Sequence, residues 1–82
     1  MVTVYILRSK TLNKFYTGQT DNLERRMEEH NRGKTPFTKS GIPWILIYSI
    51  PLESRAEAMK LEKQIKKRGA ERFLNDLGVS VG

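Results

Sequence analysis

The chain has no cysteine among its 82 residues, and this limits the ways in which it can fold. Neither a disulfide framework nor a thiolate metal site is available to it. A chain of this length buries only about 60–65% of its unfolded surface, so a small core must hold it together by packing alone. We therefore expect one domain, residues 1–82, with its core over 2–77 and a loose tail over 78–82, in a reducing compartment such as the cytoplasm. We expect no secretory signal and no membrane-spanning segment, because long apolar runs are missing.

The charge of the chain indicates the kind of partner it binds. Fifteen lysines and arginines face nine acidic residues, which gives a net charge of +6 and an isoelectric point near 9.9. Such a surface attracts polyanions, of which nucleic acid is the commonest, and it says little about fold. The alternative is a basic surface that only keeps the chain in solution.

Three segments have the composition of strands. Residues 2–8 alternate between two faces, and residues 15–19 form a second short strand in which Gly18 indicates a close backbone approach. If these strands pair so that partner numbers sum to an odd value, Tyr5 and Tyr16 share a face. Residues 44–50 are almost continuously apolar, which predicts a buried central strand that ends at Pro51.

The first predicted helix ends near residue 31 and is capped by Thr20 or Asp21. Arg26 and His30, four residues apart, lie on one of its faces. A second helix runs from a cap at Ser54 to residue 68, and a third covers residues 70–77. The apolar residues expected to face inward from these three helices are Leu23, Met27, Ala58, Met59, Leu61, Ile65, Phe73, Leu74 and Leu77.

Glu62 lies within the apolar stripe of the second helix, between Ala58 and Met59. A carboxylate on a core-facing stripe is costly unless it is paired or holds a cation. Two explanations stand side by side: a salt bridge to Arg26 or a nearby lysine, and a functional role.

The tyrosine segments and their spacing resemble the GIY-YIG endonucleases, a family named for two short tyrosine motifs. The motifs stand here as residues 3–5 and 16–18, and the family's arginine, histidine and glutamate match Arg26, His30 and Glu62. The chain is most similar to small stand-alone bacterial members and to the N-terminal module of an excision-repair endonuclease. It departs at Gln19, where some members have a lysine.

The resemblance implies a fold and a site. The fold is a mixed α/β (α+β) domain with a three-stranded antiparallel sheet flanked by helices, which agrees with the β-β-α-β-α-α order above. The implied catalytic residues are Tyr5, Tyr16, Arg26, His30 and Glu62, and we expect their side chains to converge on one concave surface.

The implied chemistry is hydrolysis of a DNA phosphodiester. Glu62 holds one Mg²⁺ (or Mn²⁺), Tyr16 or Tyr5 accepts a proton from the attacking water, Arg26 neutralises phosphate charge and His30 relays a proton. The residues expected to contact the DNA backbone without reading its sequence are Arg25, Lys39, Lys63, Lys66 and Lys67.

The biological setting expected for such a nuclease is structure-selective cleavage or DNA repair, with a protein partner that supplies specificity. A second hypothesis is a nucleic-acid binding module whose nuclease activity has decayed. A third, a protein-interaction adaptor, explains neither Glu62 nor the charge of +6.

Overall fold

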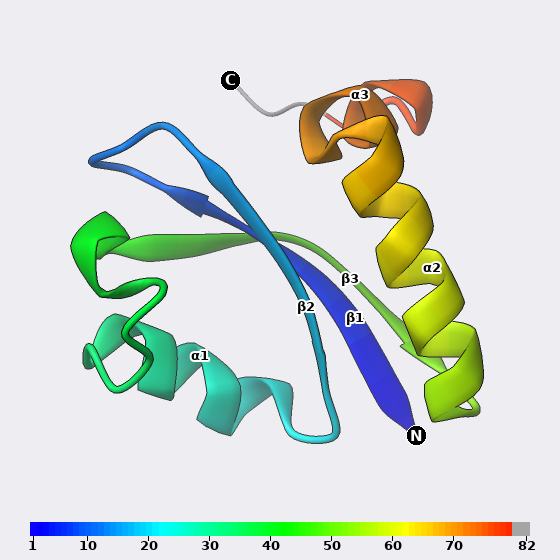
Figure 1. The fold of residues 1–82 in the computed structure, drawn as a ribbon, viewed down its shortest axis with the longest axis horizontal. Coiled ribbons are helices and arrows are strands. Elements are labelled where there is room, and N and C mark those ends of the chain that lie inside the picture. Colours follow the sequence, from blue (N-terminus) through cyan, green and yellow to red (C-terminus); the bar gives the residue numbers. More distant parts are fainter. Residues whose placement is uncertain (80–82) are drawn as a thin grey trace.

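A computed structural model describes residues 1–79 of the chain, so the end of the expected tail, residues 80–82, lies outside the described residues. The elements in chain order are β1 (Val2–Ser9), β2 (Phe15–Thr20), α1 (Leu23–Asn31), the short 3₁₀ helix η1 (Lys39–Gly41), β3 (Trp44–Leu52), α2 (Arg55–Arg68) and α3 (Ala70–Asp76). The predicted order β-β-α-β-α-α and the three-stranded antiparallel sheet are both confirmed (Figure 1).

The sheet has the strand order β2-β1-β3, so β1 lies at its centre. In the β1–β2 register Tyr5 pairs with Gly18 and Leu7 with Tyr16. In each pair the two residue numbers sum to an odd value. Directly opposed residues lie on the same face of a sheet, and so do residues two apart on one strand. Tyr5 and Tyr16 therefore share a face, as the odd-sum register requires.

The prediction that residues 44–50 form a buried central strand is wrong. β3 lies at the edge of the sheet and continues through Pro51 to Leu52, and Ile45 and Leu46 are about 40% exposed. An edge strand tolerates proline because one side of its backbone has no ladder to complete. Apolar composition does not separate the two positions, since an edge strand of a small sheet also packs one face against helices.

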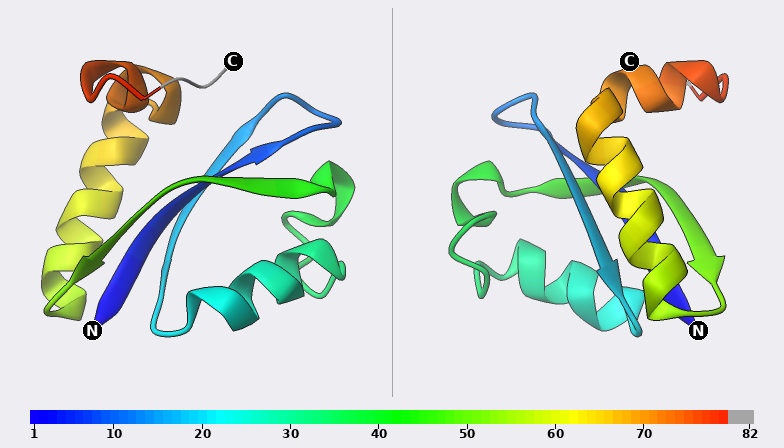
Figure 2. Two further views of the ribbon diagram at one scale, coloured as in Figure 1. Left: turned by 180° about the vertical axis from the view of Figure 1, so that it is seen from behind. Right: turned by 45° about the vertical axis from the view of Figure 1, so that its right-hand side comes forward.

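Two cores lie on opposite faces of the sheet. The α2-side core consists of Val2, Val4, Ile6, Ala58, Ile65 and Leu74. The α1-side core consists of Tyr5, Leu7 and Trp44, with Tyr16, Leu23, Met27 and Ile42 packed against it. The ribbon views agree: α1 covers one face, and α2 and α3 cover the other (Figures 1 and 2). The alternating side chains of β1 thus supply both cores.

The helix ends follow from local hydrogen bonds. Asn22, rather than the predicted Thr20 or Asp21, caps α1: its side-chain oxygen accepts a hydrogen bond from the Arg25 backbone N–H at 3.1 Å. Asp21 lies one residue too early to reach that group. Ser54 caps α2 as predicted, accepting from the backbone N–H of its third following residue at 3.2 Å.

Two of the helix residues predicted to face inward do not. Met59 is 49% exposed and Leu77 is 51% exposed. α2 contacts the sheet along the line from Ala58 to Ile65, and Met59 lies about 100° around the helix from Ala58. Leu77 is the C-cap residue of α3 and lies beyond its last packed turn.

Candidate active site

Gly18 gives the Tyr5 ring its place against β2. Tyr5 is only 1% exposed, and a Cβ added at Gly18 would lie 2.7 Å from the Tyr5 hydroxyl oxygen and 3.1 Å from the Tyr16 ring. Real Cβ atoms essentially never approach another atom as closely as 2.7 Å, so a larger residue at this position would displace the Tyr5 ring. The close approach predicted at Gly18 is therefore confirmed, and the atoms that approach are those of the two tyrosines.

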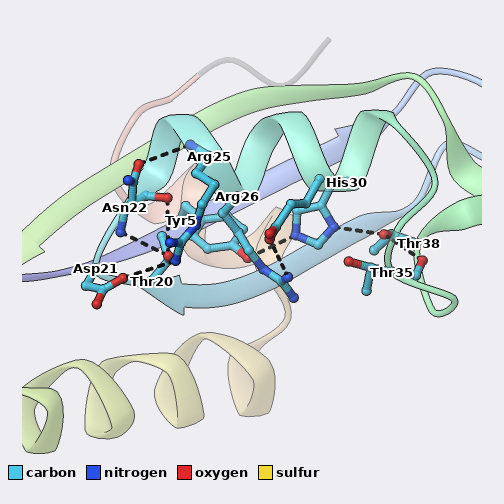
Figure 3. Close-up of polar contacts among 10 residues, drawn as sticks. Tyr5, Thr20, Asp21, Asn22, Arg25, Arg26, His30, Thr35 and Thr38 are labelled. Carbon is cyan, nitrogen blue, oxygen red and sulfur yellow. Dashed lines mark hydrogen bonds and ion pairs between the residues drawn. The ribbon is translucent and has the colours of Figure 1, made fainter.

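A buried chain of hydrogen bonds runs from β1 through α1 to the following loop (Figure 3). The Tyr5 hydroxyl lies 3.0 Å from His30 Nε2, and His30 Nδ1 lies 2.8 Å from the Thr38 hydroxyl. The Thr38 hydroxyl donates to the backbone carbonyl of Thr35 at 3.4 Å, so it accepts from His30 Nδ1–H. His30 Nε2 is then the acceptor, and the Tyr5 O–H donates to it.

Burial keeps Tyr5 and His30, the two titratable members of this chain, neutral. Loss of solvent lowers the pKa of His30, the positive charge of Arg26 lowers it further, and Glu29 opposes the shift. Loss of solvent also raises the pKa of Tyr5, against the opposing pull of Arg26. His30 is thus a neutral imidazole with a fixed tautomer, and Tyr5 is a neutral phenol.

Arg26 lies one turn before His30 on α1 and faces the same tyrosines. Its interaction with the Tyr5 hydroxyl, foremost, and those with Glu29 and Tyr16 raise the pKa of Arg26. The Arg26 guanidinium also pairs with Glu29 at 3.1 Å, which fixes its direction. The Tyr16 ring centre lies 5.0 Å from that of His30 and 6.3 Å from that of Tyr5. These four predicted residues, Tyr5, Tyr16, Arg26 and His30, are therefore brought together.

Glu62 is held by two side chains at once. Gln19 Nε2 donates to Glu62 Oε1 at 2.9 Å, and Lys66 Nζ donates to Glu62 Oε2 at 2.7 Å. Gln19 is itself held by Arg55, which donates to its side-chain oxygen at 3.0 Å. Of the partners considered from the sequence, a nearby lysine is present, whereas Arg26 pairs with another carboxylate. The Glu62 side chain is only 18% exposed.

Glu62 does not share a sheet face with the tyrosines, so the expected single concave surface is not what the structure contains. Glu62 belongs to α2, which covers the face opposite α1 (Figures 1 and 2). The two groups approach each other around the outer edge of β2, here called the β2 edge. Lys66, which pairs with Glu62, lines a pocket together with Tyr16, and the Glu62 charge contributes to the raised pKa of Tyr5. The candidate site therefore wraps around an edge strand.

Glu62 is the candidate metal ligand. Carboxylate oxygens are the donors that Mg²⁺ prefers, and an ionised carboxylate has about four lone-pair sites, of which two are used here. Within residues 1–79, no three side chains of the His, Cys, Asp and Glu types gather into a group that would hold a metal alone. The residues fit one ion that takes its remaining ligands from water and phosphate, which is the usual habit of Mg²⁺.

The predicted DNA-contacting cations fall into two groups. Lys63, Lys66 and Lys67 lie three and four residues apart on α2, so they share one exposed face of that helix. Arg25 and Lys39 lie elsewhere, on α1 and η1, and Arg25 is 3.7 Å from Asp21. Of these five cations, only Lys63, Lys66 and Lys67 lie on the same helix as Glu62, within five residues of it.

Sequence reasoning missed the residues that hold the others in place. Thr38 fixes the tautomer of His30, and its backbone carbonyl accepts from the Trp44 indole N–H at 2.7 Å. Asn31 clamps the backbone of Trp44 by two hydrogen bonds, of 2.7 and 3.1 Å. No sequence pattern marks Thr38, which lies in an irregular loop. A signal did exist for Gln19, because it stands where some GIY-YIG members carry a lysine.

Comparison with known proteins decides the family. The model of the GIY-YIG catalytic domain matches residues 1–75. The chain belongs to the GIY-YIG family. This membership supports a nuclease-type function, and it confirms the resemblance drawn from the tyrosine motifs. GIY-YIG nucleases generally depend on a divalent metal, and a nuclease domain of this type implies a DNA substrate.

Relatives of this GIY-YIG chain include UPF0213 proteins of several bacteria. One from Staphylococcus haemolyticus is 44% identical over 64 residues, covering 77% of each chain. Another from Syntrophus aciditrophicus is 46% identical over 68 residues, covering 78% of this chain and 75% of the relative. The solution NMR structure of a UPF0213 protein from Bacillus halodurans is 32% identical and has a TM-score of 0.59, covering 99% of this chain and 89% of that one. Every helix within residues 1–79 is too short or too polar to span a bilayer.

Proposed function

We propose that this GIY-YIG domain is a metal-dependent endonuclease that hydrolyses DNA phosphodiester bonds at the β2 edge. The proposal rests on one observation: two sets of side chains, from opposite faces of the sheet, approach each other at this edge. One is the cluster of Tyr16, Arg26 and the buried Tyr5–His30 pair, and the other is the Glu62 carboxylate with its lysine. A phenol, a guanidinium and a carboxylate are the groups that such a hydrolysis needs.

Tyr16 is the better candidate for the group that accepts the proton of the attacking water. It is half-buried and lines an open pocket, whereas Tyr5 is 1% exposed and already donates its proton to His30. Arg26 lies beside Tyr16 and stabilises negative charge on its oxygen once the proton has moved. Tyr5 and His30 act as a neutral, hydrogen-bonded support that holds the Tyr16 ring in place.

Arg26 also stabilises negative charge on the phosphate. A guanidinium presents a planar set of donors, and the ion pair with Glu29 at 3.1 Å fixes its direction. Charge that builds on the phosphate oxygens in the transition state then meets a donor that is already in position.

Glu62 would hold one Mg²⁺ or Mn²⁺, with Gln19 fixing the orientation of the carboxylate. Bound there, the ion supplies charge stabilisation on the phosphate and the leaving oxygen. Lys66 already neutralises Glu62 at 2.7 Å, so the carboxylate is not an uncompensated buried charge. Removing the carboxylate would leave the Lys66 ammonium without this partner, so no gain in stability is expected from its loss.

The substrate is held mainly through its backbone. Lys63, Lys66 and Lys67 present a row of cations beside Glu62, and such contacts position a strand without reading bases. We extend the proposal to a role in repair or in structure-selective cleavage, neither of which requires base readout, with a protein partner to add specificity. We place this activity in the cytoplasm, in a single domain over residues 1–82.

The test is cleavage of supercoiled plasmid and of branched DNA, with and without Mg²⁺, by the wild type and two variants. Glu62→Gln keeps the size of the side chain but removes its charge, and cleavage should fall at least ~10²-fold, since each 1.36 kcal/mol of lost transition-state stabilisation is tenfold in rate. Glu57→Gln removes an exposed carboxylate from the same helix and should leave the rate unchanged. An active Glu62→Gln enzyme would show that the assignment of Glu62 is wrong.

A second candidate, a DNA-binding module without nuclease activity, is favoured by one observation. Lys66 occupies one oxygen of the only carboxylate that we assign to the metal. If the protein binds DNA with a steep salt dependence yet cleaves nothing with Mg²⁺ or Mn²⁺, this second function replaces the first.

A further inference from the structure

Phe37 is the most exposed aromatic side chain of the candidate site. It lies in the loop between α1 and η1, is 82% exposed, and its ring centre is 5.9 Å from that of Tyr16. A single exposed apolar residue is ordinary on a protein surface. Phe37 differs from such a residue because its ring contacts Tyr16, the tyrosine proposed to activate the water. A ligand that stacks on Phe37 would therefore lie next to the proposed reaction centre.

A pocket of about 440 Å³ opens beside this ring. Its lining consists of Phe15, Tyr16, Thr17, Phe37, Lys66 and Ala70. Three aromatic rings and one ammonium group therefore face the same opening, and they come from β2, the loop and the junction of α2 with α3. The volume lies within the range of small-molecule pockets, roughly 300–1,000 Å³.

The backbone next to Phe37 is anchored although its ring is exposed. Its neighbour Thr38 is fully buried, with its hydroxyl bound to His30 and its carbonyl bound to the Trp44 indole. A ring presented by a fixed backbone loses little conformational freedom when a ligand stacks on it. Phe37 is thus a preorganised platform.

We propose that this pocket binds one unpaired nucleobase of the DNA strand, stacked on Phe37, while Lys66 contacts the adjoining phosphate. Aromatic rings next to cations are the means by which proteins hold single strands, because every base has a π-face and every nucleotide a phosphate. A base within a duplex has both faces covered by its neighbours, so only an unstacked nucleotide can enter. The inference rests on the proposed function, and it assigns to that site a preference for unpaired nucleotides.

Binding of two matched oligonucleotides in metal-free buffer tests this without any cleavage. One is an eight-nucleotide oligothymidylate, and the other is the same backbone with every base removed, so both carry the same phosphates. By fluorescence anisotropy the wild type should bind the oligothymidylate about 5- to 150-fold more tightly, the range given by stacking of one base. Phe37→Leu should lose this preference, because it keeps an apolar side chain but not the ring. Phe37→Trp should retain it.

Ile45→Ala is the matched control. Ile45 is 41% exposed on β3, at the opposite edge of the sheet from β2, and its loss should leave the preference intact. Equal binding of the two oligonucleotides by the wild type, or an unchanged preference in Phe37→Leu, would overturn the subsite. Cleavage measured separately distinguishes the two proposals: a base preference without cleavage refutes the nuclease but not the subsite, and cleavage without a base preference refutes the subsite but not the nuclease.

Discussion

Thr38 determines which nitrogen of His30 carries the proton, and a single substitution can test this. In Thr38→Val the His30 Nδ1–H would lose its acceptor in a fully buried place. A buried donor without a partner costs about 1–3 kcal/mol, so the free energy of unfolding should fall by that amount. Urea denaturation measures it. Thr38→Ser keeps the hydroxyl and should stay close to the wild type; equal losses in both variants would contradict the hydrogen bond.

His30 should make stability depend on pH in a defined direction. Its pKa in the folded state lies below 6.5, the usual value that applies to the unfolded chain. As pH falls below about 6.5, the unfolded chain takes up a proton that the folded chain does not, so stability declines until the folded pKa is reached. Above 6.5 both states are neutral, and the contribution is fully present.

The measurement is the free energy of unfolding between pH 7.5 and 5, for the wild type and for His30→Gln. The wild type should lose up to about 1.4 kcal/mol per pH unit relative to the variant, the limit for one proton. The charged groups that face His30 are Arg26, which adds to the shift, and Glu29, which opposes it. Parallel curves for the two proteins would show that His30 is not held neutral.

At the scale of elements, β2 carries the site because Gly18 lets the Tyr5 ring lie against it. Gly18→Ala would place a Cβ 2.7 Å from the Tyr5 hydroxyl oxygen and 2.9 Å from the adjoining ring carbon. Overpacking of this kind costs about 1–3 kcal/mol and should break the Tyr5–His30 hydrogen bond. Thermal or urea unfolding measures the loss of stability, and the NMR signals of the His30 ring report whether the Tyr5–His30 hydrogen bond is broken.

The double variant Gly18→Ala with Tyr5→Phe identifies the clash. Because phenylalanine lacks the hydroxyl oxygen, the combined loss of stability should be smaller than the sum of the two single losses. Strict additivity would mean that the new methyl group meets something other than the Tyr5 hydroxyl oxygen.

Much of the element pattern was predictable, because it is local. The strand alternation, the cap at Ser54 and the C-terminal glycine of α2 depend on residues a few positions apart. The position of a strand within the sheet depends on distant pairing, and β3 was misplaced for that reason. In the site, the shared face of Tyr5 and Tyr16 was foreseen only on the condition of an odd-sum register, and the register itself comes from the structure. The interaction of Gln19 with Glu62, 43 residues apart, was beyond any local pattern.

At the scale of the whole molecule, a net charge of +6 should make DNA binding strongly dependent on salt. Affinity should fall with a log–log slope of about −0.9 per duplex phosphate neutralised. Replacing Lys63, Lys66 and Lys67 together by glutamine should reduce the magnitude of that slope by up to about 3, equally for unrelated sequences. Affinity measured between 50 and 200 mM salt, a range over which such binding changes by orders of magnitude, would show it.

A second triple variant separates local from overall charge. Replacing Lys10, Lys14 and Arg32 by glutamine removes the same number of charges, but none of these residues lies on α2. Its salt dependence should stay nearer to that of the wild type. If both triple variants behave alike, total charge governs binding and the α2 face has no special part.

Substitutions in the two cores, which lie on opposite faces of the sheet, differ in which properties of the protein they affect. Substitutions in the α2-side core, such as Ile6→Val or Leu74→Met, change the stability of the fold at residues that do not belong to the core of Tyr5 and Tyr16. In the α1-side core Tyr5 and Tyr16 both fill the interior and belong to the proposed active site, so a change at either residue affects stability and activity together. A lineage can therefore adapt to heat or cold through the buried apolar residues of the α2-side core, whereas Tyr5 and Tyr16 are constrained by stability and activity at once.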